Sequence, residues 1–161
     1  MQITADNQTE TKRAFVFPGQ GSQSVGMGQE FYDSSRAARA VFQEADDILG
    51  VRLSKLIFQG PSRKLQDTVN SQPAIMTVSI AAWKAWEEFT GSELEPPAAL
   101  AGHSLGEYTS MVVAGVVSFA DGVTLVRQRG RLMQQASKGR PGGMAAILGL
   151  DELAASQICS E

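Results

Sequence analysis

Apolar side chains recur along the chain at spacings that predict several helices. Residues 34–49 place them three and four positions apart, as on one face of a helix, and Gly50 follows as a helix end. Residues 73–89 begin at Pro73, stop before Gly91 and are apolar on nearly every side, so we expect this helix to be buried in a larger body. Further helices are predicted at 53–58, 62–68, 105–114, 119–136 and from 151 onward.

Three short apolar runs, at 14–17, 98–101 and 144–148, predict buried strands. The first run is followed by a loop, Pro18 to Gly28, that contains four glycines. Because strands alternate with helices, the fold class is α/β with a mainly parallel sheet. Parallel sheets are covered on both faces and usually have more strands, so we expect this chain to be the N-terminal part of a longer protein.

Composition narrows the class of protein. The chain has 161 residues and is 43% hydrophobic and 19% charged, which is typical of a globular domain. A net charge of −3 predicts no attraction to nucleic acid or to an anionic membrane. Residues 1–13 are polar and predict a flexible leader without the apolar segment of a secretory signal, and the apolar runs are too short to span a bilayer. The single cysteine, Cys159, excludes an internal disulfide. We therefore expect a cytoplasmic protein without a metal site.

The segment Gly102-His103-Ser104-Leu105-Gly106 is a G-x-S-x-G motif between a predicted strand and a predicted helix. In this context the motif predicts a sharp turn that exposes the serine hydroxyl as a nucleophile. The backbone N–H of Leu105 would point to where an oxyanion forms, and the helix N-terminus would favour that negative charge. The alternative is an ordinary helix start in which Ser104 is the N-cap.

A serine nucleophile needs a general base within about 3 Å, and the chain has one histidine, His103. Neighbouring side chains on a tight turn point in different directions, so we interpret His103 as a packed or hydrogen-bonded spacer and not as the base. Glu107, in the first turn of the following helix, either supplies a favourable charge there or has a direct role.

The segment Phe17 to Gln23 is rich in glycine and follows a predicted strand. It lacks the lysine and the spacing of a phosphate-binding P-loop. Two interpretations remain, a plain turn and a loop that supplies the second oxyanion donor that a serine acyl enzyme requires.

Arg129 lies on the apolar face predicted for the helix 119–136, between Leu125 and Leu132. A guanidinium there is costly unless it is paired or faces a cavity. It is either part of a structural ion pair, a side chain that extends to solvent, or a fork for a substrate carboxylate, which arginine binds through two parallel hydrogen bonds.

Several motifs together resemble one family, the malonyl-CoA:acyl-carrier-protein transacylases of fatty-acid synthesis. The resemblance is collinear and covers nearly all of residues 14–161, and it separates the free-standing enzymes less well from the related acyltransferase domains of polyketide synthases. The motifs are Phe15-Val16-Phe17-Pro18-Gly19-Gln20-Gly21-Ser22-Gln23, Gln72-Pro73-Ala74, Gly102-His103-Ser104-Leu105-Gly106-Glu107-Tyr108, Arg129-Gly130 and Gly143-Met144-Ala145-Ala146.

The resemblance implies a hydrolase-like α/β core at 14–137 and, at 138–161, the start of an inserted ferredoxin-like subdomain. It implies that Ser104 takes malonyl from malonyl-CoA and passes it to acyl carrier protein, that the N–H groups of Gln20 and Leu105 form the oxyanion hole, and that Arg129 grips the malonyl carboxylate. Coenzyme A and phosphopantetheine would be substrate carriers, with no cofactor bound by the protein.

The resemblance also places the family's catalytic histidine beyond residue 161, so we expect negligible turnover from residues 1–161 alone. Three alternatives stay open: an acyltransferase domain of a polyketide synthase, a serine hydrolase or thioesterase, and a non-catalytic fragment. The roles of Gln72 and Glu107 are also open.

Overall fold

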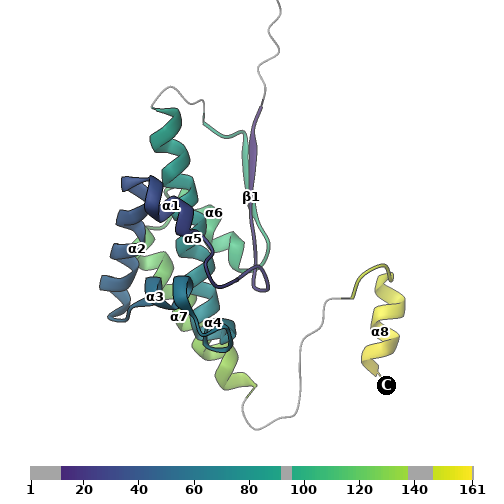
Figure 1. Ribbon diagram of the computed structural model, residues 1–161. Helices are drawn as coiled ribbons and strands as arrows, with labels where there is room; N and C mark the ends of the chain where they lie inside the picture. Colours follow the sequence, from purple (N-terminus) through teal and green to yellow (C-terminus); the bar gives the residue numbers. More distant parts are fainter. Residues whose placement is uncertain (1–11, 92–95, 138–146, 161) are drawn as a thin grey trace, which may run out of the picture.

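The computed structural model describes residues 12–91, 96–137 and 147–160 (Figure 1). Two strands, β1 (Ala14–Phe17) and β2 (Ala99–Gly102), form a parallel pair in which Phe17 is the partner of Gly102. The helices are α1 (Gln29–Ser34), α2 (Arg36–Leu49), α3 (Leu53–Gln59), α4 (Ser62–Gln66), α5 (Thr68–Thr90), α6 (Leu105–Val113), α7 (Phe119–Ala136) and α8 (Glu152–Ser160). The predicted parallel α/β class is confirmed.

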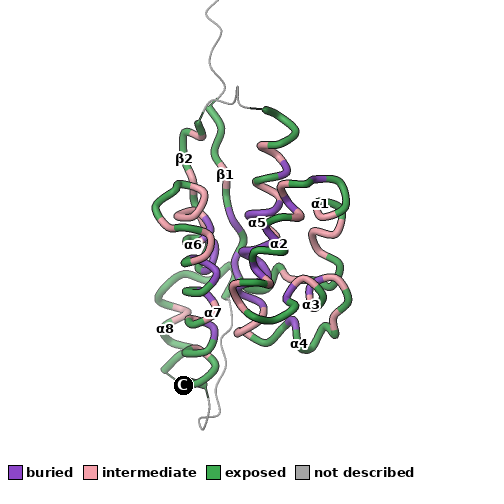
Figure 2. The backbone as a smooth tube through the Cα atoms, turned by 90° about the vertical axis from the view of Figure 1, so that its left-hand side faces the viewer, coloured by how far each residue is buried: buried purple, intermediate pink, exposed green. Residues whose placement is uncertain are grey.

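Helix α5 is the centre of the packing. Helices α2, α6 and α7 all lie against it, and every side chain from Ser71 to Thr77 is buried. Figure 2 shows the buried positions concentrated on α5 and on the inner faces of its neighbours. The predicted burial of this helix is therefore confirmed.

The predicted start of this helix at Pro73 is wrong, because α5 begins five residues earlier, at Thr68. Proline inside a helix removes the hydrogen bond to the carbonyl four residues back, here that of Val69. Tertiary packing compensates for this loss, since Ser71 and Gln72 are fully buried and α7 lies against the first turn at Thr68. Propensity alone could not indicate this helical turn.

The region before α2 also differs from the prediction. Helix α1 was not predicted, because six residues are too few to show a helical period, and it is positioned by Tyr32, whose ring packs on those of Phe42 and Phe58. Helix α2 starts at Arg36, two residues later than predicted, because Ser35 is its N-cap and accepts a hydrogen bond of 3.0 Å from Ala38 N.

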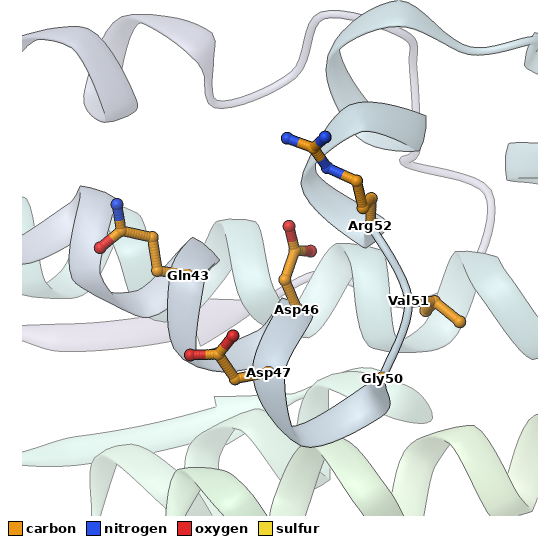
Figure 3. Close-up of a pocket in the computed structure, with 6 residues that line it drawn as sticks. All are labelled: Gln43, Asp46, Asp47, Gly50, Val51 and Arg52. Carbon is orange, nitrogen blue, oxygen red and sulfur yellow. The ribbon is translucent and has the colours of Figure 1, made fainter.

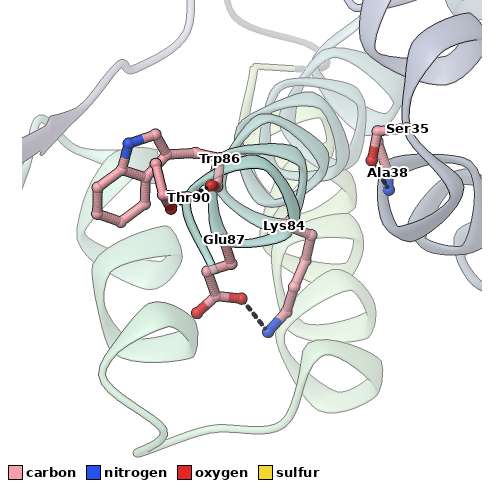
Figure 4. Close-up of polar contacts among 6 residues, drawn as sticks. All are labelled: Ser35, Ala38, Lys84, Trp86, Glu87 and Thr90. Atoms are coloured by element: carbon pink, nitrogen blue, oxygen red, sulfur yellow. Dashed lines mark hydrogen bonds and ion pairs between the residues drawn. The ribbon is translucent and has the colours of Figure 1, made fainter. Parts of the chain in front are cut away.

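Two polar contacts lie within the C-terminal half of α5 (Figure 4). Lys84 and Glu87 form an ion pair of 2.7 Å, and the Thr90 hydroxyl donates to the Trp86 carbonyl. The Ser35 hydroxyl and the Ala37 N–H donate to the carboxylate of Glu88, and these bonds lower the pKa of Glu88. The N-terminus of α2 is thereby tied to α5.

The sheet has one covered face in the described part of the chain. Phe15 packs its ring against Trp83 and Trp86 of α5, with ring centroids 5.0 and 4.9 Å away, and α6 lies against both strands. On the other face Val16 is 74% exposed. Because the strands are parallel, the segments that follow β1 and β2 lie at the same end of the sheet.

Helix α7 has the predicted bounds, and its N-cap is Ser118, which accepts a 3.0 Å hydrogen bond from Asp121 N. The prediction that Leu125 and Leu132 share its buried face is wrong, because they are 48% and 55% exposed. At about 100° per residue both lie to one side of the buried stripe, which is formed by Gly122, Val123, Val126 and Gly130. Arg129 is half-buried and lies at the edge of this stripe.

Part of the predicted C-terminal strand, at 144–146, falls outside the described residues, and Ile147 and Leu148 are not in a strand. The helix predicted from 151 onward is confirmed as α8, which buries none of its residues. The domain boundaries at 13 and 138 stay predictions.

The backbones of α5 and α7 are in close contact at Gly130. A Cβ atom added there would lie 2.5 Å from the Thr68 carbonyl oxygen and 2.9 Å from Val69 Cα, both of which belong to the backbone of α5. A methyl group therefore cannot be accommodated without separating the two helices.

We predict that Gly130→Ala destabilises the protein by about 1–3 kcal/mol, because overpacking outweighs the gain of about 1 kcal/mol in helix propensity. Gly122→Ala in the same helix is the matched control. It gains a similar propensity, and the nearest atoms to its added Cβ would be side-chain atoms, Val112 Cγ2 at 2.7 Å and the end of Met76, which can shift where the backbone of α5 cannot. Urea unfolding monitored by circular dichroism measures both variants. A Gly130→Ala protein as stable as Gly122→Ala would contradict the prediction.

Candidate active site

Ser104 occupies a strained turn between β2 and α6. Its φ of 53° and ψ of −101° make it the one non-glycine residue with positive φ in the described ranges, a conformation that costs about 1–3 kcal/mol. The Ser104 side chain makes no capping hydrogen bond to α6, so this is not an ordinary capped helix start. The geometry is that of a nucleophile elbow, as the motif predicted.

Two glycines allow the turn to pack tightly. A Cβ atom on Gly102 would overlap the backbone of Gly106, and one on Gly106 would overlap the carbonyl of Phe17 in β1. The N–H of His103 donates to the same Phe17 carbonyl at 3.1 Å, which extends the pairing of the strands past β2. The motif glycines therefore fix the Ser104 turn against the end of β1.

The imidazole of His103 is turned toward the segment after β1. A Cβ on Gly19 would lie 2.5 Å from His103 Nδ1, and His103 is not a hydrogen-bond partner of Ser104 in the part of the chain described. This geometry agrees with the spacer interpretation. Glu107 is exposed in the first turn of α6 and its carboxylate bonds to no described residue, which favours the role of a helix-terminus charge.

The segment Pro18–Gln23, which we name the β1 loop, is held by its own side chains. Ser22 Oγ donates to the Gly19 carbonyl at 3.0 Å, Gly21 N donates to Gln23 Oε1 at 2.8 Å, and Gln20 Nε2 donates to Thr68 Oγ1 of α5 at 3.3 Å. The backbone N–H groups of Gln20 and Leu105 donate to no described residue. Both N–H groups are at the end of the sheet where Ser104 lies.

The Arg129 guanidinium contacts three neutral groups. Nη2 donates to Ser104 Oγ at 3.0 Å, Nη1 donates to Gln72 Oε1 at 2.8 Å, and Cζ lies 5.7 Å from the ring centroid of Tyr108. These contacts bring together α5, α6 and α7, which supply Gln72, Tyr108 and Arg129. The predicted site residues Arg129 and Ser104 are thus direct neighbours.

Gln72 is a fully buried amide whose role the sequence left open. Its Nε2 donates to the sulfur of Met133 at 3.2 Å, which leaves Oε1 directed at Arg129. Sequence reasoning also missed Tyr108. Gln72 carries a signal in the sequence, because it is an amide within an apolar helix. Tyr108 follows the Ser104 motif in the first turn of the predicted helix.

No carboxylate neutralises Arg129 within the described residues, where the ion pair is that of Lys84 and Glu87. The structural ion pair considered for Arg129 is therefore not seen there. A half-buried cation with neutral partners keeps its attraction for an anion, and a guanidinium binds a carboxylate through two hydrogen bonds. The arrangement can hold an acyl group that carries a negative charge beside the Ser104 hydroxyl.

Two surface pockets are lined by neither Ser104 nor Arg129. One, of about 490 Å³, is at the C-terminal end of α2, where Asp46 already accepts two hydrogen bonds from Ser54 (Figure 3). The other, of about 280 Å³, lies between β1 and α5 and is largely aromatic. Across the described ranges no three metal-binding side chains gather, and none of the helices has the length and apolarity to traverse a membrane.

The fold and the site together define an α/β protein with a serine on a nucleophile elbow and a fixed cation beside it. Residues 14–161 match the acyl transferase domain family, and the chain belongs to that family.

The chain is similar to the malonyl CoA-acyl carrier protein transacylase of Salmonella typhimurium LT2, with 48% identity over 94% of this chain and 48% of the relative. It is also similar to the solved acyl-carrier-protein S-malonyltransferase of Bartonella henselae, with a TM-score of 0.86, 45% identity, and 92% and 48% of the two chains covered. A second similar structure is a malonyl-transacylase in complex with a type II polyketide synthase acyl-carrier protein, with a TM-score of 0.81, 41% identity, and 93% and 48% covered. The chain spans about half the length of these relatives.

Proposed function

We propose that the full-length protein transfers a malonyl group from coenzyme A to the phosphopantetheine thiol of an acyl carrier protein. The observation that carries this proposal is the Arg129 guanidinium, which lies 3.0 Å from Ser104 Oγ without a carboxylate partner among the described residues. The names of the relatives, malonyl transacylases and malonyltransferases, support the same reaction.

In the first half of the reaction Ser104 Oγ attacks the thioester carbonyl of malonyl-CoA. The elbow exposes the hydroxyl, and the N–H groups of Gln20 and Leu105 stabilise the oxyanion that forms. The tetrahedral intermediate then expels the coenzyme A thiolate and leaves a malonyl ester on Ser104. In the second half the phosphopantetheine thiol attacks this ester and regenerates the serine, which makes the overall transfer a ping-pong reaction.

Arg129 selects the acyl group. The malonyl carboxylate takes over guanidinium N–H groups, including the one that bonds Ser104 in the free protein, so binding of the correct acyl group also releases the nucleophile. An acetyl group has no carboxylate and gains nothing from Arg129. Gln72, fixed by Met133, keeps the guanidinium oriented throughout.

The general base that takes the proton of Ser104 comes, as the family resemblance implies, from beyond residue 161. Coenzyme A and phosphopantetheine act as substrate carriers, and we propose that the protein works in the cytoplasm without a bound cofactor. A second candidate for the acceptor is the acyl carrier protein of a polyketide synthase. The relative solved with such a carrier favours it. The reaction is the same in both cases.

We predict that Ser104→Ala in the full-length protein abolishes covalent labelling by radioactive malonyl-CoA and lowers transfer by at least about 10³-fold, since the nucleophile is lost. Ser110→Ala is the matched control, because that hydroxyl lies in the adjacent helix α6 and, among the described residues, donates to the Glu107 carbonyl and not to Arg129. Gel autoradiography and a transfer assay measure the two effects. A label that persists in Ser104→Ala would refute the assignment.

We predict that Arg129→Ala lowers kcat/KM for malonyl-CoA about 100-fold, the loss expected for charge-assisted hydrogen bonds to a carboxylate, and leaves that for acetyl-CoA largely unchanged. Arg131→Ala serves as control, since Arg131 is exposed on the same helix. The ratio of the two kcat/KM values is measured with purified acyl carrier protein. An unchanged malonyl-to-acetyl ratio in Arg129→Ala would remove Arg129 from the acyl-binding role.

A further inference from the structure

Tyr108 occupies a defined place relative to the elbow. It lies in the first turn of α6, the helix whose N-cap is Ser104. Its ring is partly buried and packs against the hydrophobic core, so the orientation of the ring is fixed from below. The Arg129 guanidinium lies over this ring, with Cζ 5.7 Å from the centroid.

We propose that Tyr108 is a positioning residue whose ring holds the Arg129 guanidinium beside Ser104, and that it thereby contributes to the preference for an acyl group with a carboxylate. This inference rests on the function proposed above. The negative face of an aromatic ring attracts a cation within about 6 Å, and the Arg129 geometry satisfies this condition.

The ring has an advantage over a polar partner at this position. A guanidinium has five N–H donors, and contact with a ring face uses none of them. In the free protein Gln72 and Ser104 each accept one hydrogen bond from Arg129, so donors remain for a substrate. An aspartate or glutamate in place of Tyr108 would fix the guanidinium equally well but would neutralise its charge and compete with the substrate carboxylate.

Two residues hold the same cation in different ways. Gln72 holds one N–H group of the guanidinium by a hydrogen bond, and the Tyr108 ring attracts the cation from 5.7 Å. Weakening the ring's attraction without changing its size therefore loosens Arg129 while the elbow and the Gln72 contact stay in place. We therefore expect weaker binding of acyl groups that carry a carboxylate and unchanged binding of other acyl groups.

The test replaces Tyr108 in the full-length enzyme by phenylalanine and by pentafluorophenylalanine. The first keeps the electron-rich ring face, and the second has almost the same size and a reversed ring electrostatic potential. Single-turnover acylation of Ser104 is followed with radioactive malonyl-CoA and with acetyl-CoA. The same two replacements at Tyr32, which carries Arg39 over its ring at 5.2 Å in another part of the chain, are the matched control.

We expect Tyr108→Phe to retain wild-type acylation. With pentafluorophenylalanine at 108, the half-saturating concentration of malonyl-CoA should rise about 2- to 5-fold, with the maximal rate and acetyl-CoA acylation unchanged. The Tyr32 replacements should alter neither substrate. Equal acylation by the Phe and pentafluoro variants, or an equal loss with malonyl-CoA and acetyl-CoA, would overturn the role of Tyr108 alone. A wild-type enzyme that transfers no malonyl group would overturn the proposed function and this inference with it.

Discussion

The close approach of α7 to α5 at Gly130 is the contact on which the candidate site depends. Because Gly130 has no side chain, its helix rests directly on the backbone of Thr68 and Val69. Arg129 is the neighbouring residue, and the same contact sets its distance from Gln72, one turn further along α5. The packing of the two helices therefore determines the position of the Arg129 guanidinium.

A second constraint brings Ser104 to that guanidinium. The parallel register of β1 and β2 places Phe17 beside Gly102, so the two segments that follow the strands meet at one end of the sheet. The absence of side chains at Gly102 and Gly106 then lets the Ser104 turn close against β1. Helix packing positions Arg129 and strand pairing positions Ser104. The 3.0 Å hydrogen bond between the two residues therefore depends on both features of the fold.

The sequence predicted the parts whose signals are local. The elbow at Ser104 and the span of α7 follow from a motif and a period, and both are confirmed. The contacts of Gln72 and Tyr108 with Arg129 could not be predicted. These two residues belong to other helices and are 57 and 21 residues from Arg129 in the sequence. The turn of α5 before Pro73 was missed for the same reason, since tertiary packing stabilises it against its own propensity.

The central claim is that the charge of Arg129 is reserved for the acyl group carried by Ser104. The most direct measurement is a crystal structure of the full-length protein after reaction with malonyl-CoA. The account predicts a malonyl ester on Ser104 whose carboxylate accepts two hydrogen bonds from Arg129, at about 2.7–2.9 Å, with the Tyr108 ring still beneath the guanidinium. A malonyl carboxylate bound by other groups, or directed into solvent while Arg129 stays on Ser104 and Gln72, would contradict it.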